Sequence, residues 1–251
     1  MLPLERQNKI VDIISAKHSA SVEELAHSLD VSAMTVRRDL DKLERMGLIL
    51  RTHGGAVQAH VHSNEIGYEQ KNTHNHNEKE TLANIALSLI KEGDSIYLDA
   101  GTTTFKLASL IAKTFSNLTV VTNDLNIATC LVQTKLNIIM CGGNVQNVTG
   151  STIGPLTQDF LRNIKVNISF VAASSISEDF NIMTPTLDKV YLKREAVGVG
   201  SRSYLIADKD KFYSQALFKV VHLSAFTGII TDKIFTEAEQ KQLQALEIEI
   251  I

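Results

Sequence analysis

Residues 31–50 constrain the fold more strongly than any other segment, because they combine a helical pattern with an arginine-bearing face. Ser32 suits a helix N-cap, since its hydroxyl can accept a hydrogen bond from a free amide of the first turn. Gly47 ends the pattern as a residue that tolerates positive φ. Apolar residues at helical spacing form one stripe: Val36, Leu40, Leu43 and Met46. The polar face either faces solvent or enters a DNA major groove.

The flanking segments favour DNA binding. An apolar helix is predicted over residues 5–17, and the spacing of Ser21 and Glu24 is that of a capping box before a second, short helix. A tight turn at residues 30–31 joins that helix to the Ser32 helix, which is the arrangement of a helix-turn-helix.

A β-hairpin wing is predicted over residues 48–57, because an apolar strand, a turn with two glycines and a second strand follow one another. Arg51, His53 and Gly54 lie at its tip, where they can meet phosphate or the minor groove. Three helices and a hairpin predict a winged helix-turn-helix.

The residues of this motif are Ser32-Ala-Met-Thr-Val-Arg-Arg-Asp-Leu, Leu43-Glu44, Gly47 and His53-Gly-Gly-Ala56. In type and spacing they resemble the DNA-binding signature of DeoR-type bacterial transcriptional repressors, over nearly all of residues 1–57. The resemblance implies that four residues lie at the groove: Ser32, Thr35, Arg37 and Arg38. An arginine can pair with guanine or clamp phosphate, and the sequence does not decide between these roles. We expect Asp39 to orient a neighbouring arginine rather than to contact DNA.

Composition limits the other classes of protein. The formal net charge is −3, so DNA affinity must come from the placement of charges and from pairing two copies. The sequence has no run of 18 apolar residues and no signal pattern, so we expect a cytoplasmic protein without a membrane span. Cys130 and Cys141 lie in apolar contexts and are expected to be buried thiols rather than a disulfide.

Residues 58–77 are predicted to be a linker, because the apolar period is lost there. They hold two His-x-His pairs, at residues 60–62 and 74–76, which could bind zinc. A polar linker is favoured instead, because neither cysteine nor carboxylate completes a clear ligand set. The predicted domains are therefore residues 1–57 and 78–251, and the sequence predicts neither a metal nor a cofactor.

From residue 78 onward, helical and strand patterns alternate, which predicts a parallel sheet covered by helices. The expected helices lie at residues 80–91, 103–113, 124–133, 187–199 and 237–246. The expected strands lie at residues 95–98, 118–122, 137–141, 166–173, 203–207, 228–231 and 247–251. Ligands of such sheets bind at the carboxyl ends of the strands.

Polar residues gather at those strand ends. The segment Asp99-Ala-Gly-Thr-Thr-Thr104 opens a helix, where Gly101 lets the backbone turn and the threonine hydroxyls and amides can hold an anion such as phosphate. The alternative is a plain turn capped by threonine. Similar ends at residues 122–124, 142–144, 208–211 and 231–232 predict a pocket for a small hydroxylated anion.

These segments also resemble, in order, the DeoR-type effector domain, whose fold resembles ribose-5-phosphate isomerase. The resemblance implies a sensor of a phosphorylated sugar or a related metabolite. The implied effector residues are Asp99, Gly101, Thr102, Thr103, Thr104, Asn123, Gly142, Gly143, Lys193, Asp208 and Lys211. Four residues depart from the family pattern and would make one side of the pocket bulkier: Asn167, Ser174, Ser175 and Asn181.

Two functions follow from these expectations, and an activator with the architecture of the first is distinguished from a repressor only by the family resemblance. The first is a transcriptional repressor of carbohydrate catabolism that leaves operator DNA when the metabolite binds, acting as a homodimer or homotetramer on paired half-sites. The second is a sugar-phosphate isomerase with an added DNA-binding module, with Asp99 or Asp208 as the base. The first is favoured, because the sequence shows no base paired with an oxyanion donor and the winged helix would otherwise be idle.

Overall fold

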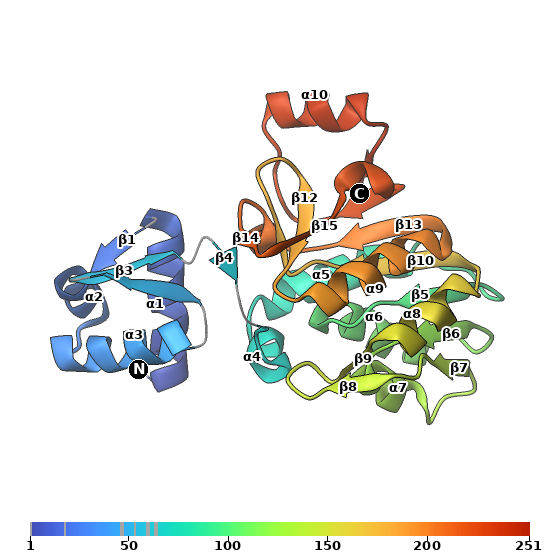
Figure 1. The fold of residues 1–251 in the computed structure, drawn as a ribbon, viewed down its shortest axis with the longest axis horizontal. Coiled ribbons are helices and arrows are strands. Elements are labelled where there is room, and N and C mark those ends of the chain that lie inside the picture. The colour runs from blue at the N-terminus through green and yellow to red at the C-terminus, as the bar shows by residue number, and fades with distance from the viewer. Residues whose placement is uncertain (1, 18, 46–47, 53, 59–60, 63–64) are drawn as a thin grey trace. The chain divides into compact units, whose positions relative to one another are not determined.

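A computed structural model describes residues 2–17, 19–45, 48–52, 54–58, 61–62 and 65–251. The chain divides into two compact units, Met1–Ile66 and Gly67–Ile251 (Figure 1). Of the wing and helix-end residues named above, His53, Met46 and Gly47 lie outside the described residues.

The first unit is a winged helix-turn-helix, as predicted. Its helices and strands are α1 (Pro3–Lys17), β1 (Ser19–Ser21), α2 (Val22–Leu29), α3 (Ala33–Arg45), β2 (Ile49–Thr52), β3 (Gly55–Gln58) and β4 (Val61–His62). Strand β1, which was not predicted, pairs antiparallel with β3 and extends the β2–β3 hairpin to three strands. The sequence gives little signal for so short a strand.

The predicted apolar stripe of α3 forms part of the core of this unit. Val36, Leu40 and Leu43 are buried, and they pack with buried side chains of α1, α2 and β2. Ser21 and Glu24 form the predicted capping box at α2. Ser32 caps α3, since its Oγ accepts a hydrogen bond from the Thr35 amide at 3.2 Å.

The second unit is built on a seven-stranded parallel sheet, with strand order β17-β16-β13-β10-β5-β6-β7. The strands are β5 (Ser95–Leu98), β6 (Thr119–Thr122), β7 (Asn137–Met140), β10 (Val166–Ala172), β13 (Gly200–Ile206), β16 (Gly228–Ile230) and β17 (Glu249–Ile250). All seven agree with the predicted strands to within a few residues.

Helices cover both faces of the sheet (Figure 1). Buried residues of α5 (His76–Leu87), α6 (Thr102–Thr114) and α7 (Leu125–Leu131) belong to one apolar cluster. Those of α8 (Pro155–Arg162), α9 (Leu187–Gly198) and α10 (Glu237–Ala245) belong to a second. Because helices bury the strands on both faces, the strand sequences are nearly continuous runs of apolar residues.

The chain reverses its direction across the sheet between β5 and β10. It first runs from β5 through β6 to the edge strand β7, and then returns to pair β10 with the other side of β5. It continues outward through β13, β16 and β17. Ligands of open α/β sheets bind beside such a reversal, at the carboxyl ends of the strands.

Several short elements were not predicted. Strands β8 (Asn144–Gln146) and β9 (Ser151–Ile153) form a hairpin, and β11 (Ser175–Ile176), β12 (Asn181–Thr184) and β15 (Phe218–His222) form a small antiparallel sheet. The remaining short elements are β14 (Gln215–Ala216) and 3-10 turns at Lys209–Lys211 and Leu223–Ala225. Strands this short carry too few residues for a recognisable alternation.

The structure differs from the predicted linker over residues 67–77, which belong to the second unit. Helix α4 (Tyr68–Thr73) lies in this stretch, and α5 starts at His76 rather than at residue 80. His74 pairs with Asp210, and His76 lies 2.7 Å from the Lys106 ammonium. Where the chain is described, no group of three or more His, Cys, Asp or Glu is placed to hold a metal.

Both cysteines are free thiols, as predicted. Cys141 is fully buried, and burial raises the pKa of its thiol to about 12, whereas Cys130 is only half-buried. Among the described helices, none has the length and apolar character needed to span a membrane.

Candidate functional site

Helix α3 presents the polar face that was predicted to meet DNA. Arg37 and Arg38 are exposed, on the side opposite the buried stripe. Ser32 and Thr35 lie at the start of the helix, where their side-chain oxygens are 2.9 Å apart. Within the described residues, neither guanidinium forms a salt bridge, so both remain available to phosphate or to base edges.

Asp39 is turned away from this face and joins α3 to α1. Its carboxylate accepts hydrogen bonds from Arg6 Nε at 2.5 Å and from Gln7 Nε2 at 2.8 Å, and the residue is 5% exposed. The prediction that Asp39 orients an arginine is confirmed. That arginine is Arg6 rather than a neighbour within α3.

The wing residues differ in their surroundings. The Arg51 Nε lies 3.8 Å from the Asp41 carboxylate, and the Arg51 amide donates to Glu44 at 3.3 Å. These contacts connect the start of the wing to α3. Gly54 is exposed at the turn, with open space around it among the described residues.

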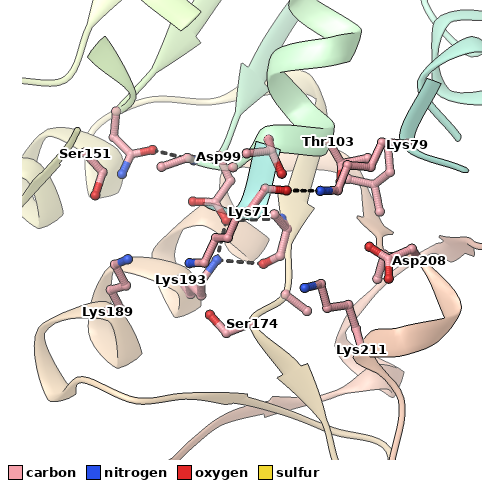
Figure 2. Close-up of a pocket in the computed structure, with 18 of the residues that line it drawn as sticks. Lys71, Lys79, Asp99, Thr103, Ser151, Ser174, Lys189, Lys193, Asp208 and Lys211 are labelled. Carbon is pink, nitrogen blue, oxygen red and sulfur yellow. Dashed lines mark hydrogen bonds and ion pairs between the residues drawn. The ribbon is translucent and has the colours of Figure 1, made fainter. Parts of the chain in front are cut away.

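A pocket in the second unit lies where the sheet order reverses, at the carboxyl ends of β5, β10 and β13 and at the N-terminus of α6 (Figure 2). It contains eight of the eleven predicted effector residues: Asp99, Gly101, Thr102, Thr103, Asn123, Lys193, Asp208 and Lys211. It also contains residues that were not predicted: Lys71, Lys79, Ala100, Ser151, Ala172, Ala173, Lys189, Leu192, Ile206 and Ala207.

The N-terminus of α6 faces this pocket. Its N-cap is Gly101, which supplies no side chain to cap the first amides. Thr102 and Thr103, both buried, place hydroxyls beside these amides. A helix N-terminus of this kind favours an anion, because unpaired amides and the helix dipole point toward it.

Gly101 is required by close packing. A Cβ at this position would lie 2.9 Å from the Ala172 Cβ and 3.2 Å from the Thr104 Oγ1. The backbone of the β5–α6 turn therefore approaches β10 more closely than a side chain permits.

Three of the predicted effector residues, Thr104, Gly142 and Gly143, lie outside the pocket lining. The Thr104 hydroxyl donates to the Asp99 and Gly101 carbonyls at 2.7 and 2.9 Å, so it holds the turn rather than a ligand. The two glycines follow the edge strand β7, where the Thr157 hydroxyl donates to the Gly142 carbonyl at 2.8 Å. They pack the start of α8 instead.

Asp99 and Lys193 form a buried ion pair at the base of the pocket. The Lys193 Nζ donates to the Asp99 Oδ2 at 2.5 Å and to the Ala172 carbonyl at 2.6 Å, and the Ala172 amide donates to the same carboxylate oxygen at 3.1 Å. The two side chains are only 3% and 6% exposed. These mutual contacts fix the end of β5 to the end of β10.

Asp208 combines a fixed oxygen with an unpaired one. Its Oδ1 accepts from the Asn75 Nδ2 at 3.0 Å and from the Asp210 amide at 3.2 Å. Its Oδ2 is buried and has no hydrogen-bond partner among the described residues. A buried carboxylate oxygen without a donor is costly, so it points to a ligand that supplies a hydroxyl or an amine.

Asn123 shapes the pocket rather than offering free groups. Its Oδ1 accepts from the Tyr97 hydroxyl at 2.9 Å and from the Ala100 amide at 3.0 Å, and its Nδ2 donates to the Thr152 carbonyl at 3.2 Å. Burial raises the pKa of Tyr97, so that phenol remains a donor. Asn123 thereby fixes the backbone just before α6.

Of the four departures from the family pattern, only Ser174 lines the pocket. Asn167 lies at the start of β10, where its side chain accepts from the Ser95 amide and hydroxyl at 2.8 Å. Ser175 and Asn181 belong to the small antiparallel sheet. The expected bulkier wall is therefore limited to one serine.

The sequence signals for the unpredicted lysines were uneven. Lys189 precedes Lys193 by four residues on α9, a spacing that places both on one helix face and could have revealed it. Lys71 and Lys79 lie in or beside the stretch taken as a linker, where nothing in the pattern marks them. Together, five lysines and two aspartates line the pocket, so its charge favours an anion.

Comparison with known proteins agrees with this architecture. Residues 6–61 match the DeoR-like helix-turn-helix domain, and residues 74–233 match the DeoR C-terminal sensor domain. An uncharacterised HTH-type transcriptional regulator of Haemophilus influenzae is 34% identical over 251 residues, which is 100% of this chain and 97% of that protein. The glycerol-3-phosphate regulon repressor of Escherichia coli is 31% identical over 92% of each chain.

Two further comparisons concern a sugar-related relative and a solved structure. The lactose phosphotransferase system repressor of Streptococcus mutans is 32% identical over 97% of this chain and 98% of its own length. Ribose 5-phosphate isomerase A of Methanocaldococcus jannaschii superposes on 55% of each chain, with a TM-score of 0.40 and 13% identity.

A winged helix-turn-helix joined to a sensor domain defines the class of DNA-binding transcriptional regulators. The chain belongs to the DeoR family of that class. Family membership decides between the two predicted functions: this is a regulator, and the isomerase alternative is set aside.

Proposed function

We propose that this regulator represses a carbohydrate-catabolism operon and is released from its operator when a phosphorylated sugar or related metabolite occupies the pocket of the second unit. The observation that carries the proposal is the pocket itself. It joins the N-terminus of α6 and an excess of lysines to the Asp208 Oδ2, a buried carboxylate oxygen that has no donor among the described residues.

The phosphate would bind at the N-terminus of α6. The first amides of the helix and the Thr102 and Thr103 hydroxyls supply donors, and Lys211 supplies charge. Lysine suits this role because its ammonium acts as a compact point charge.

The sugar hydroxyls would bind at the acidic side of the same pocket. A hydroxyl that donates to the Asp208 Oδ2 would satisfy the unpaired oxygen. Asp99 contributes less directly, because its Oδ2 is engaged by Lys193 and by the Ala172 amide. Two relatives support a carbohydrate context, since they are repressors of a glycerol-3-phosphate regulon and of a lactose phosphotransferase system.

Operator DNA would be read by α3 and the wing of the first unit. Ser32, Thr35, Arg37 and Arg38 would lie in the major groove, with Arg51, His53 and Gly54 at the backbone or minor groove. We further propose a cytoplasmic homodimer or homotetramer, because paired half-sites are matched by paired subunits.

A thermal-shift screen of the full chain against phosphorylated sugars and their unphosphorylated parents tests the sensing proposal. A ligand at 100 times its Kd adds about 2.7 kcal/mol to the free energy of unfolding. Thr103→Ala and Lys211→Ala should abolish the shift, while Lys241→Ala, an exposed lysine of α10, should retain it. Stabilisation that survives both pocket substitutions would show that the ligand binds elsewhere.

A second measurement tests repression itself. Operator DNA selected from random sequence should be bound by the free protein and released by the stabilising sugar phosphate. An increase in DNA affinity on ligand binding would contradict release as the mode of control.

A further inference from the structure

The second unit begins with a helical corner that forms one wall of the pocket. We define the α4–α5 corner as residues 68–79, which comprise α4, a two-residue turn and the first turn of α5. It contributes Lys71 and Lys79 to the pocket lining (Figure 2). In the chain, it directly follows the boundary between the two units at residue 66.

Lys79 holds the corner in shape. Its ammonium donates to the backbone carbonyls of Lys71 and of His74, the latter at 2.6 Å, so one side chain ties the end of α4 to α5. The residue is only 2% exposed. Among the described residues, the hydrogen-bond acceptors of this buried ammonium are neutral carbonyls, which is a costly arrangement unless a negative charge comes close.

The groups around Lys79 disfavour its positive charge. Burial, together with the nearby positive charges of Lys211 and Lys106, lowers the pKa of Lys79 to about 8, against the opposing effects of Asp208 and Glu78. An anion placed between the N-terminus of α6 and this corner would relieve the repulsion among the lysines.

A hydrogen bond joins the corner to the ligand-facing carboxylate. The Asn75 Nδ2 donates to the Asp208 Oδ1 at 3.0 Å and to the Asp210 Oδ2 at 2.7 Å, and His74 lies 3.2 Å from the same Asp210 oxygen. Asn75 adopts a left-handed conformation (φ 51°), which asparagine tolerates. The Asp208 that would hold a ligand hydroxyl on Oδ2 therefore holds the corner on Oδ1.

The other end of the corner is attached to different elements. The Tyr68 amide donates to the Val148 carbonyl at 3.1 Å, and the Tyr68 ring packs edge-on against Phe105 of α6, with centroids 6.1 Å apart. The corner thus rests on the same helix whose N-terminus would hold the anion.

We propose that Lys71 and Lys79 are anion ligands of the effector site, and that the Asn75–Asp208 hydrogen bond latches the α4–α5 corner over the bound anion. This inference rests on the proposed phosphate site at α6. Occupancy then changes the stability of the segment that leads directly to the DNA-binding unit, which is the coupling that a ligand-controlled regulator needs.

Hydrogen exchange of the full chain tests the inference with inorganic phosphate as the probe, compared with sodium chloride at equal ionic strength. In the wild type, phosphate should slow exchange of the amides at 68–75 by about tenfold, the factor expected for a charge-assisted contact. The amides at 102–104 should be slowed in the same experiment.

Asn75→Asp is the informative variant, because aspartate keeps the left-handed backbone but places a carboxylate against Asp208 and Asp210. It should lose the protection at 68–75 and keep the protection at 102–104. Asn84→Asp is the matched control, since Asn84 is exposed on α5 and its side-chain amide donates within its own helix, to the Glu80 carbonyl at 2.8 Å.

The outcomes separate this inference from the proposed function. Protection at 102–104 without protection at 68–75 in the wild type would leave the phosphate site intact and overturn the role of the corner. Protection at neither segment would overturn both. Equal behaviour of Asn75→Asp and Asn84→Asp would show that the hydrogen bond to Asp208 is not the latch.

Discussion

Replacing Asp39 by alanine should destabilise the winged helix-turn-helix selectively. The Asp39 carboxylate is the shared acceptor for Arg6 at 2.5 Å and Gln7 at 2.8 Å, and it joins α3 to α1. Asp39→Ala leaves the Arg6 guanidinium, whose side chain is 13% exposed, without its partner and removes the acceptor from the buried Gln7 amide.

The expected loss follows from that burial. Removing one partner of a buried ion pair costs 3–5 kcal/mol, and the residual exposure of Arg6 places this pair near the lower end, at about 3 kcal/mol. A unit of 66 residues has a total free energy of unfolding of about 3–10 kcal/mol. Each kcal/mol lost shifts the melting temperature of a domain of this size by about 4–8 °C, so the thermal unfolding midpoint of this unit should fall by at least about 12 °C.

The chain offers an internal control for this measurement. All five tyrosines lie in the second unit and the sequence has no tryptophan, so tyrosine fluorescence reports on the second unit alone. Far-ultraviolet circular dichroism reports on both units. Asp39→Ala should lower the transition of the first unit and leave the tyrosine transition in place.

Two further variants sharpen the test. Asp39→Asn keeps an oxygen acceptor without the charge and should cost less, about 1–2 kcal/mol. Asp41→Ala removes an exposed carboxylate that lies 3.8 Å from Arg51 and should cost less than about 1 kcal/mol. Equal midpoints for Asp39→Ala and Asp41→Ala would refute the reasoning that burial decides the size of the effect.

Three other outcomes are expected. Arg37→Ala or Arg38→Ala should weaken operator binding in a titration without changing the melting temperature. Loss of a phosphate contact should lower the slope of log affinity against log salt concentration by about one. Unchanged binding in both variants would show that the DNA-binding face has been assigned to the wrong residues. Gly101→Ala should lower the free energy of unfolding by about 1–3 kcal/mol, as measured by thermal denaturation, because the new Cβ would lie 2.9 Å from the Ala172 Cβ. Gly142→Ala is the control, since its Cβ would meet no described atom within 4 Å and the substitution should change the stability little. Phosphate binding at pH 8 should take up about half a proton, because the anion raises the pKa of Lys79 from about 8. The affinity for phosphate should therefore fall as the pH rises above 8. Calorimetry in two buffers of different ionisation enthalpy measures the proton uptake, and equal heats of binding in the two buffers would contradict it.

The parts of the fold that were predicted correctly are those with long local patterns. The Ser32 cap and the buried stripe of α3 depend on neighbouring residues, and so do the capping box at α2 and the apolar strands of the sheet. The short elements β8, β9, β11 and β12 gave no such signal, because two to four residues specify little on their own.

The differences between the predicted site residues and the pocket lining have a different physical cause. Gly142 and Gly143 follow a strand as Asp99 and Asp208 do, but β7 is the edge strand and its end lies away from the reversal between β5 and β10. Strand order is a tertiary property, so the sequence pattern alone does not exclude that position. Lys79 was missed because its place in the pocket depends on the packing of the α4–α5 corner, most of which was predicted to be a polar linker.

The reversal of strand order also determines when the sensor can exist during synthesis. Strand β5 pairs with β10 and β10 pairs with β13, and the Asn75–Asp208 contact joins residues 133 positions apart. The winged helix-turn-helix needs only the first 66 residues, whereas the pocket is incomplete until β13 and the turn after it have emerged from the ribosome. Folding of such long-range pairs is slow. A chain interrupted before β13 would therefore retain the winged helix-turn-helix while lacking the part of the pocket that β13 and the turn after it supply.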